Sequence, residues 1–519
     1  MEKLSPEILS LIAGHLFEQP RRAPFRADSS QASTPRAPYA CISRKWQAAV
    51  EPYIFAQISL KSSELPTFAA AFSSSPYRRL LLRRIAYDVC LHTHGDSRAD
   101  HARNSEAFGS SMRGLMELLA DWERALDGQD ESHLGKLELS LGFVWDIDSD
   151  ADGPVDHNFN VCKSSAARRY LTLDNGDENG SSSLPTVRRV TAFKVDVSLG
   201  LAPHPGTMCR LAGLFPNLEG LDLEYRDPAI KRREMRQEHR VALARGLDDL
   251  RVRLPRLKRV CIRRQGATDP WDHGFANQDL EVDGVDPLCD SVRQIIEAGT
   301  LTELELVDVL LSPDLFRDRR GGPDNACAYF SALRRFMIKV GILAPSGKWY
   351  YTGDPAAVEA GSLDPDDVDL DDEDSDSDDS DDEDSGDEDN TDRDAVVNGE
   401  RPYHPWRTRP DTETFDPLVK SMAEAVLWGM PSLEWGCLEV GTDQDTAVGV
   451  IIQCCAAGQA FVQPPDRSGS YPGEKQARRW KAWVGLDTSW HVPEDIMAVW
   501  KEWIGEEGKI EKATWPPIN

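Results

Sequence analysis

Apolar residues recur every three or four positions in two stretches near the start of the chain. The first stretch contains Leu4, Ile8, Leu11, Ile12 and Leu16. This spacing predicts a helix with one apolar side, which Ser5 can cap and in which Pro6 is tolerated as the first helical residue. The second stretch contains Tyr39, Ile42, Trp46, Val50 and Tyr53. Because proline interrupts helical hydrogen bonding, we predict that this helix ends near Pro52 and that a short third helix carries Phe55.

A different pattern recurs through the middle of the chain, where Pro-x-Leu or Pro-x-Val precedes the apolar–polar alternation of a strand. It occurs at residues 184–190, 215–223, 254–262 and 430–433, and segments 134–141 and 301–306 show the alternation without the proline. Helix-like stretches are found at residues 112–126, 234–250, 288–298 and 326–340. This succession predicts a mixed α+β and α/β fold, with a parallel sheet and helices outside it. The intervals of 31 and 39 residues from Val187 to Leu218 to Leu257 exceed the ~20 to 29 of regular leucine-rich repeats, so we expect irregular, leucine-rich-repeat-like units.

The end of the chain predicts a small α+β module. Helices are expected at residues 415–428 and 493–504, and strands at 433–440, 448–454 and 479–484. Trp500 and Trp503 lie at helical spacing, and we interpret them as core residues rather than as a ligand cage, because aromatic rings bury a large area wherever they pack.

The two N-terminal stretches together resemble an F-box. The resemblance rests on Leu4, Glu7, Ile8 and Leu9, and on Ser43-Arg44-x-Trp46. Ser5 stands where the family usually has proline, and residues 18–38, rich in Pro, Arg, Ser and Ala, separate the helices as an insertion that we interpret as disordered. The alternative is an ordinary helical hairpin at the start of a domain.

The resemblance implies a three-helix module that docks onto a Skp-type adaptor of a cullin-RING ubiquitin ligase, while the rest of the chain selects an unknown protein substrate. It implies the adaptor-contact candidates Leu4, Pro6, Ile8, Leu9, Ile12, Leu16, Ile42, Trp46, Val50 and Phe55. The end of the chain, including Trp480, Trp490 and Trp500, resembles the C-terminal region of filamentous-fungal F-box-like proteins, which implies no known chemistry.

The expected organisation has four parts. These are an F-box-like module at residues 1–60, a leucine-rich-repeat-like domain at 61–350, a disordered acidic linker at 355–400, and the α+β module at 401–519. The last part is either separate from the middle domain or continuous with it.

The net charge of −29 is concentrated in one tract. Asp364 to Asp394 contains 20 acidic residues against the single Arg393, a local charge of −19, which leaves −10 for the other residues. Like charges at this density repel one another, so we predict a solvated spacer that divides the folded chain in two. Ser375, Ser380 and Ser385 each precede an acidic residue by three positions and are candidates for phosphorylation. A scaffold or chaperone for basic nuclear proteins is an alternative function that this tract would support.

One segment is strongly basic. Its cationic residues include the substrate-contact candidates Arg251, Arg253, Lys258, Arg259, Arg263 and Arg264. On a strand, alternating cations would form one charged face, which could bind an acidic or phosphorylated substrate, or the acidic tract of the same chain. A solvated strand face is the alternative.

Catalytic chemistry has little support in the sequence. His92-x-His94-x-Asp96, after an expected strand at residues 85–91, resembles the zinc ligands of metallo-β-lactamase-like hydrolases, with His157 or His204 as later ligands. However, Ser97 stands where that family has histidine, so an exposed loop is the favoured interpretation. Phosphate-binding loops, nucleophile elbows and zinc-protease helices have no matching motif. We therefore expect a non-catalytic protein without metal or cofactor.

The remaining composition indicates a cytoplasmic or nuclear protein. Met1-Glu-Lys opens no secretory leader, and the longest uncharged apolar stretch, residues 447–462, is too short to span a membrane. The ten cysteines lack a C-x-x-C pair, so we expect reduced and mostly buried thiols. Neither a membrane nor a nucleic acid is expected as a partner.

Overall fold

A computed structural model describes the chain over residues 4–17, 37–91, 98–125, 135–145, 170–173, 184–197, 202–265, 269–317, 329–357, 396, 398–399, 401, 403–442, 447–461 and 477–515. The chain forms two compact units. The first comprises residues 1–152, 172–198 and 214–218, and the second comprises 153–171, 199–213 and 219–519. This boundary falls inside the segment expected to form one domain at residues 61–350.

The first unit begins with three helices, α1 (Pro6–Phe17), α2 (Ala37–Ala40) and α3 (Arg44–Phe55). The elements that follow are β1 (Gln57–Lys61), the 3-10 turn η1 (Ser62–Glu64), α4 (Leu65–Ser73), α5 (Pro76–Leu81), β2 (Arg84–Leu91), α6 (Arg98–Arg124), β3 (Leu137–Trp145) and β4 (Val190–Val195). The four strands pair in sequence order, all in parallel. The prediction that Pro52 ends the second long helix is wrong, because α3 continues through Pro52 to Phe55. The short extra helix, α2, lies before α3 rather than after it.

The second unit is built from alternating helices and strands. Its main elements are α7 (Pro205–Ala212), β5 (Gly220–Arg226), α8 (Arg233–Arg253), β6 (Arg259–Gln265), α9 (Pro287–Glu297), β7 (Glu303–Val307), β8 (Arg335–Val340), β9 (Tyr351–Thr352), β10 (Arg409–Pro410), α11 (Phe415–Glu424), β11 (Trp435–Gly441), β12 (Gly449–Cys455), β13 (Arg479–Gly485), α12 (Glu494–Ile504) and β14 (Lys509–Trp515). Short turns are η3 (Pro313–Leu315) and η4 (Pro355–Ala357), and a π-helical turn at Ala425–Gly429 extends α11. The sheet order is β5-β6-β7-β8-β11-β12-β13-β14, parallel except that β12 is antiparallel to both neighbours.

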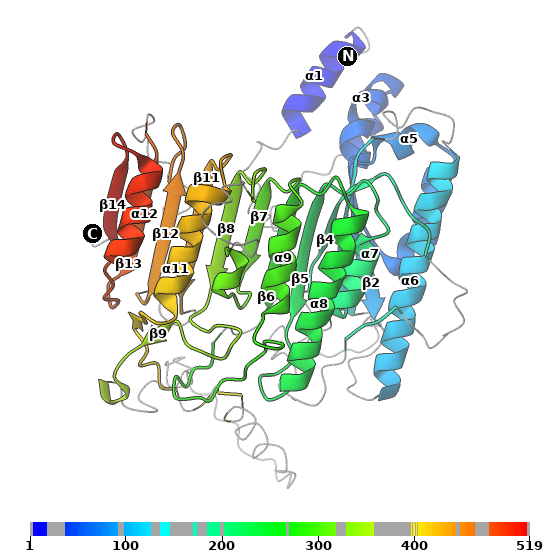
Figure 1. Ribbon diagram of the computed structural model, residues 1–519. Coiled ribbons are helices and arrows are strands. Elements are labelled where there is room, and N and C mark those ends of the chain that lie inside the picture. The colour runs from blue at the N-terminus through cyan, green and yellow to red at the C-terminus, as the bar shows by residue number, and fades with distance from the viewer. Residues whose placement is uncertain are drawn as a thin grey trace, which may run out of the picture. The chain divides into compact units, whose positions relative to one another are not determined.

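Helices cover one face of the second unit's sheet. Figure 1 shows α8, α9, α11 and α12 lying side by side against the same face. Residues alternate accordingly: in β6, Val260, Ile262 and Arg264 are buried, whereas Arg259, Cys261 and Arg263 on the other face are exposed or half-buried. The expectation of a mostly parallel α/β sheet with helices outside it is confirmed for this unit.

Strands β6, β7, β8 and β11 of the second unit begin in the same way. The carbonyl of Glu219 accepts two backbone hydrogen bonds, from the N–H groups of Lys258 (2.8 Å) and Arg259 (3.0 Å). The same two-donor arrangement recurs at the carbonyls of Lys258, Thr302 and Arg334. A buried leucine precedes each of these starts, and these leucines are Leu218, Leu257, Leu301, Leu333 and Leu433. The recurring Pro-x-Leu phrase therefore marks the starts of β5, β6 and β11, and a leucine without the proline marks those of β7 and β8.

The strand at β8 replaces an expected helix. Residues 326–340 show apolar spacing of three and four at Phe330, Leu333 and Phe336, but Phe336, Ile338 and Val340 also alternate with period two. In the structure, Phe330 and Leu333 lie in a turn and the alternating residues form β8. β14 was not predicted, because Glu511 and Lys512 together interrupt the apolar–polar alternation between Ile510 and Ala513.

The acidic tract lies outside the described residues, but the chain on its two sides joins one sheet. β8, before the tract, pairs in parallel with β11, after it. Closer to the tract, Tyr351–Thr352 of β9 pairs with Arg409–Pro410 of β10. Arg407 donates to the carbonyl of Tyr351 (3.1 Å). The expectation that the tract divides the folded chain in two is therefore wrong, because the described residues before and after it belong to the same unit.

The C-terminal elements match their expected positions. Trp500 of α12 is fully buried, and its ring stacks on Trp480 of β13 with centroids 4.8 Å apart and planes at 3°. Trp503, only 5% exposed, is also buried, so Trp500 and Trp503 are both core residues, as their helical spacing predicted. Within the described residues, no helix combines the length and apolarity that a membrane span requires.

Candidate functional site

The helices α1 and α3 pack on each other through one apolar cluster. Its buried members are Leu9, Ala13, Phe17, Trp46, Ala49 and Val50. Leu4, Ile12, Tyr39 and Tyr53 pack against it while remaining half-buried. The edge of the Tyr39 ring meets Phe17, with ring centroids 5.3 Å apart, and so holds the end of α1 beside α2.

The start of α3 explains why Ser43 and Trp46 occur together. The Ser43 side chain accepts a hydrogen bond from the Trp46 backbone N–H at 3.3 Å, which caps the helix. Trp46 is then placed one turn into the helix, where only 6% of it is exposed. The two residues thus fix where α3 begins and how it enters the cluster.

A second set of apolar residues, on α1 and in the turn before α3, faces solvent. Exposed fractions are 45% for Ile8, 66% for Leu11, 54% for Leu16 and 50% for Ile42. Ile8, Ile12 and Leu16 are spaced by four residues, so they follow one another along the flank of α1. Large apolar side chains concentrated in this way on a short segment are typical of a protein-binding surface. We call Ile8, Leu11, Leu16 and Ile42 the apolar surface.

The structure thus places the ten adaptor candidates in different environments. Leu9, Trp46 and Val50 are core residues, and Leu4 and Ile12 border the core. Pro6, Ile8, Leu16 and Ile42 are exposed. Phe55 is half-buried and packs on Phe72 of α4, with centroids 5.5 Å apart, so it connects α3 to the rest of the first unit. Leu11 was predicted as part of the apolar stripe but not as an adaptor contact, although it is the most exposed residue of the apolar surface.

Polar contacts reinforce the connection between α3 and the following helices. Glu51 of α3 pairs with Arg78 of α5 at 2.9 Å, and Gln47 donates to the same carboxylate at 3.0 Å. The Arg78 guanidinium also lies 4.9 Å from the centre of the Phe55 ring. The helices α1 to α3 are therefore fastened to the first unit through the second half of α3.

The basic segment does not form the single charged strand face that was expected. Arg251 and Arg253 lie in α8, not on a strand. Arg263 is neutralised by Asp222 (2.7 Å) and Glu305 (3.0 Å) on the neighbouring strands. Arg264 is buried on the helix-covered face. Lys258 and Arg259 remain exposed at the start of β6, where Lys258 contacts Glu219 at 3.3 Å.

Arg264 belongs to a buried ionic network that the sequence analysis missed. It pairs with Asp227 at 3.0 Å and donates to the Asp308 carbonyl at 2.6 Å, and Arg236 approaches Asp227 at 3.6 Å. Burial alone would raise the pKa of Asp227, but Arg264 and Arg236 outweigh it and hold that pKa below its usual value. Partners 37 residues apart carry no signal of their pairing in a single sequence.

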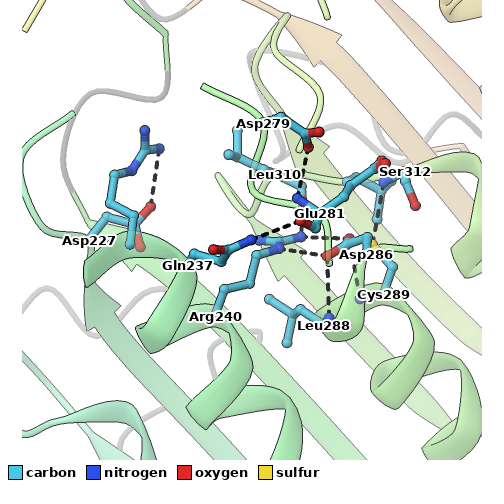
Figure 2. Close-up of polar contacts among 12 residues, drawn as sticks. Asp227, Gln237, Arg240, Asp279, Glu281, Asp286, Leu288, Cys289, Leu310 and Ser312 are labelled. Carbon is cyan, nitrogen blue, oxygen red and sulfur yellow. Dashed lines mark hydrogen bonds and ion pairs between the residues drawn. The ribbon is translucent and has the colours of Figure 1, made fainter. Parts of the chain in front are cut away.

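Arg240 and Asp286 extend the network between α8 and α9. Figure 2 shows Arg240 directed at Asp286, which also caps the start of α9 by accepting from the N–H groups of Leu288 and Cys289. Burial would lower the pKa of Arg240, but the Asp286 carboxylate outweighs it and raises that pKa. The pair ties together two helices and, through the Leu310 carbonyl (2.7 Å), the loop after β7. This arrangement is a structural tie, because its charged groups bond to one another.

Several predicted features lie outside the described residues. These are the insertion except its last residues, the cluster His92, His94 and Asp96 with His157, the acidic tract, and Ser375, Ser380 and Ser385. His204 is described: it caps α7, with Nδ1 accepting from the Gly206 N–H at 3.2 Å. Among the residues that the structure describes, no group of three His, Cys, Asp or Glu side chains is placed to hold a metal ion.

No protein-family model matches this chain, and no curated protein matches it either.

Proposed function

We propose that the chain is an F-box-type substrate receptor, which binds a Skp-type adaptor through the apolar surface of its N-terminal helices and presents a protein substrate to a cullin-RING ubiquitin ligase. The observation that supports this most is the separation of roles along α1. Leu9, Ala13 and Phe17 complete the internal cluster, while Ile8, Leu11 and Leu16 stay exposed.

A helical hairpin that served only its own domain would have little use for these exposed residues. Between 45 and 66% of each of these three side chains of a 12-residue helix is exposed, so leaving them uncovered forgoes roughly half of the ~1.5 to 3 kcal/mol that full burial of each contributes. A partner that covers them recovers this free energy. The attachment of α3 to α4 and α5 supports the same proposal, since a receptor must hold adaptor and substrate in a fixed relation.

Co-purification with a Skp-type adaptor tests the proposal. The adaptor should be captured by the intact chain and lost with Ile8→Asp and with Leu16→Asp, because each substitution places a charge on the apolar surface. Ser10→Asp is the matched control: it adds the same charge at an exposed position of α1, on the opposite flank of the helix from Ile8 and Leu16. Trp46→Ala is unsuitable alone, because it also removes a core residue. Equal capture of the adaptor by all three aspartate variants, or no capture by the intact chain, would refute the receptor role.

A further inference from the structure

Cationic residues lie together at the amino-terminal ends of the second unit's strands. We call Arg251, Arg253, Arg256, Lys258, Arg259, Arg334 and Arg335 the basic edge. Lys258 and Arg259 stand at the start of β6, and Arg334 and Arg335 occupy the equivalent position at β8. β7 lies between them, so the two pairs are separated by two strand spacings, about 10 Å. α8 ends at the same edge with Arg251 and Arg253, and Arg256 lies in the turn that follows.

These side chains are directed to solvent. All seven cations are exposed, with 55% for Lys258, 62% for Arg334 and 54% for Arg335. Three carboxylates share the edge, Glu219, Glu303 and Glu434, and Asp248 and Asp249 one helical turn earlier do not cancel the cationic excess. Glu434 serves both Arg334 (3.3 Å) and Arg335 (3.4 Å). In a chain with a net charge of −29, this is a local reversal of sign.

We propose that this basic edge binds an acidic peptide segment of a partner protein. Carboxylates are the anions that the edge already accommodates, at Glu219 and Glu434, and the two cation pairs lie at a spacing that fits an extended peptide. In the polyproline II conformation, which rises about 3.1 Å per residue with three residues per turn, acidic side chains three residues apart project from the same side and reach from one pair to the other. Val252, 74% exposed between Arg251 and Arg253, offers an apolar contact beside the charges.

The edge suits a peptide better than a nucleic acid. A phosphate backbone carries charge without interruption, whereas Glu219, Glu303 and Glu434 interrupt the cations of this edge. The remaining charge of the chain also repels a long polyanion. For the receptor proposed above, the acidic peptide is the substrate class. The inference rests on the proposed function only for this assignment, and not for the peptide binding itself.

Fluorescence polarisation of a labelled peptide tests the inference. The probe is a twelve-residue peptide of Asp-Ser-Gly repeats, compared with the same peptide carrying Asn for Asp, a serine-phosphorylated form and a single-stranded oligonucleotide. The intact chain should bind the aspartate peptide, fail to bind the asparagine peptide, and lose affinity as salt rises from about 0.05 to about 0.5 M. Because the chain's own acidic tract carries the same kind of charge as the probe, a variant lacking Asp364 to Asp394 is measured in parallel.

Matched charge variants locate the site. Arg253→Gln with Arg334→Gln and Arg335→Gln should weaken peptide binding about tenfold or more. Arg317→Gln with Lys348→Gln and Lys501→Gln removes the same charge from exposed positions elsewhere and should leave affinity within about twofold. Equal effects of the two triple variants, absence of aspartate-peptide binding with and without the tract, or stronger binding of the oligonucleotide would overturn the inference. Adaptor capture needs none of these peptides, so failure here and failure of the receptor role are separate results.

Discussion

Arg240 and Asp286 form a two-pronged ion pair inside the second unit, with Nε to Oδ1 at 2.6 Å and Nη2 to Oδ2 at 2.7 Å. Asp286 is fully buried and Arg240 nearly so. Removing one partner leaves the other charge buried and unpaired, so Asp286→Ala should lower the free energy of unfolding by about 3 to 5 kcal/mol. Asp314→Ala breaks an exposed Arg317 pair and should cost below about 1 kcal/mol. Urea denaturation of both variants makes the comparison, and similar losses would show that the buried pair has no special role.

His273 should make the second unit sensitive to mild acid. It is fully buried, its Nδ1 accepts from the Arg407 N–H at 2.8 Å, and burial, with Arg407 nearby, lowers its pKa to about 3. Because the unfolded chain takes up this proton near pH 6.5 and the folded chain does not, stability is complete above that pH and falls on acidification. At pH 5 the loss from this residue should be about 2 kcal/mol.

His273→Asn keeps an acceptor near the Nδ1 position but does not titrate. Unfolding free energies measured at pH 7.5, 6 and 5 in denaturant should therefore fall less steeply for the variant than for the parent. His239, whose pKa burial lowers to about 4, contributes a similar slope to both proteins. Parallel slopes for parent and variant would contradict the assignment to His273.

The N-terminal helices should respond differently to substitutions at the core and at the surface. Ser43→Ala removes the cap of α3 and should cost about 1 kcal/mol, and Trp46→Ala should cost about 3 to 5 kcal/mol. Ile8→Asp, at an exposed position, should stay within about 0.5 kcal/mol. Hydrogen exchange of the α3 amides reports the local opening free energy in each case. Strong loss of protection in Ile8→Asp would mean that the apolar surface is part of the fold.

Cys41 should be far more reactive than the buried thiols. It is exposed next to Ile42, whereas burial raises the pKa of Cys209 to about 12 and leaves almost no thiolate at neutral pH. Brief treatment with iodoacetamide followed by peptide mass spectrometry should modify Cys41 before Cys209 and the other buried thiols of the described residues. If a Skp-type adaptor covers the apolar surface, its addition should slow the alkylation of Cys41, and an unchanged rate would place the adaptor elsewhere.

Local patterns predicted elements wherever one periodicity dominated. Residues 448–454 form a run that is apolar apart from Gln453, and nearly all of it becomes the fully buried β12. Residues 326–340 fit both a helical and a strand period. In the structure Phe330 and Leu333 lie in a turn, and β8 starts directly after it, where Arg334 and Arg335 donate to the Thr302 carbonyl. For the N-terminal helices, spacing indicated the apolar stripe but could not assign Ile8 to solvent and Leu9 to the core, because that choice depends on where α3 packs.

Charge pairing was the least predictable feature. Arg263 and Arg264 are neighbours in the sequence, yet one lies among the carboxylates of adjacent strands and the other is buried beside Asp227. Alternation along the strand predicts that they face opposite sides, but not which side the helices cover. Arg334 and Arg335 belong to the basic edge because β8 lies two strands from β6 in the sheet, and no local sequence pattern reveals this strand order.

The shared way in which strands begin has a consequence for how this chain can change in length. Each carbonyl at Glu219, Lys258, Thr302 and Arg334 receives the next strand through the same two amides, whatever the sequence between them. A whole helix–strand block could therefore be duplicated or excised, and the flanking strands would rejoin through an identical junction. Modular growth of this kind accommodates spacings as unequal as 31 and 39 residues within one architecture.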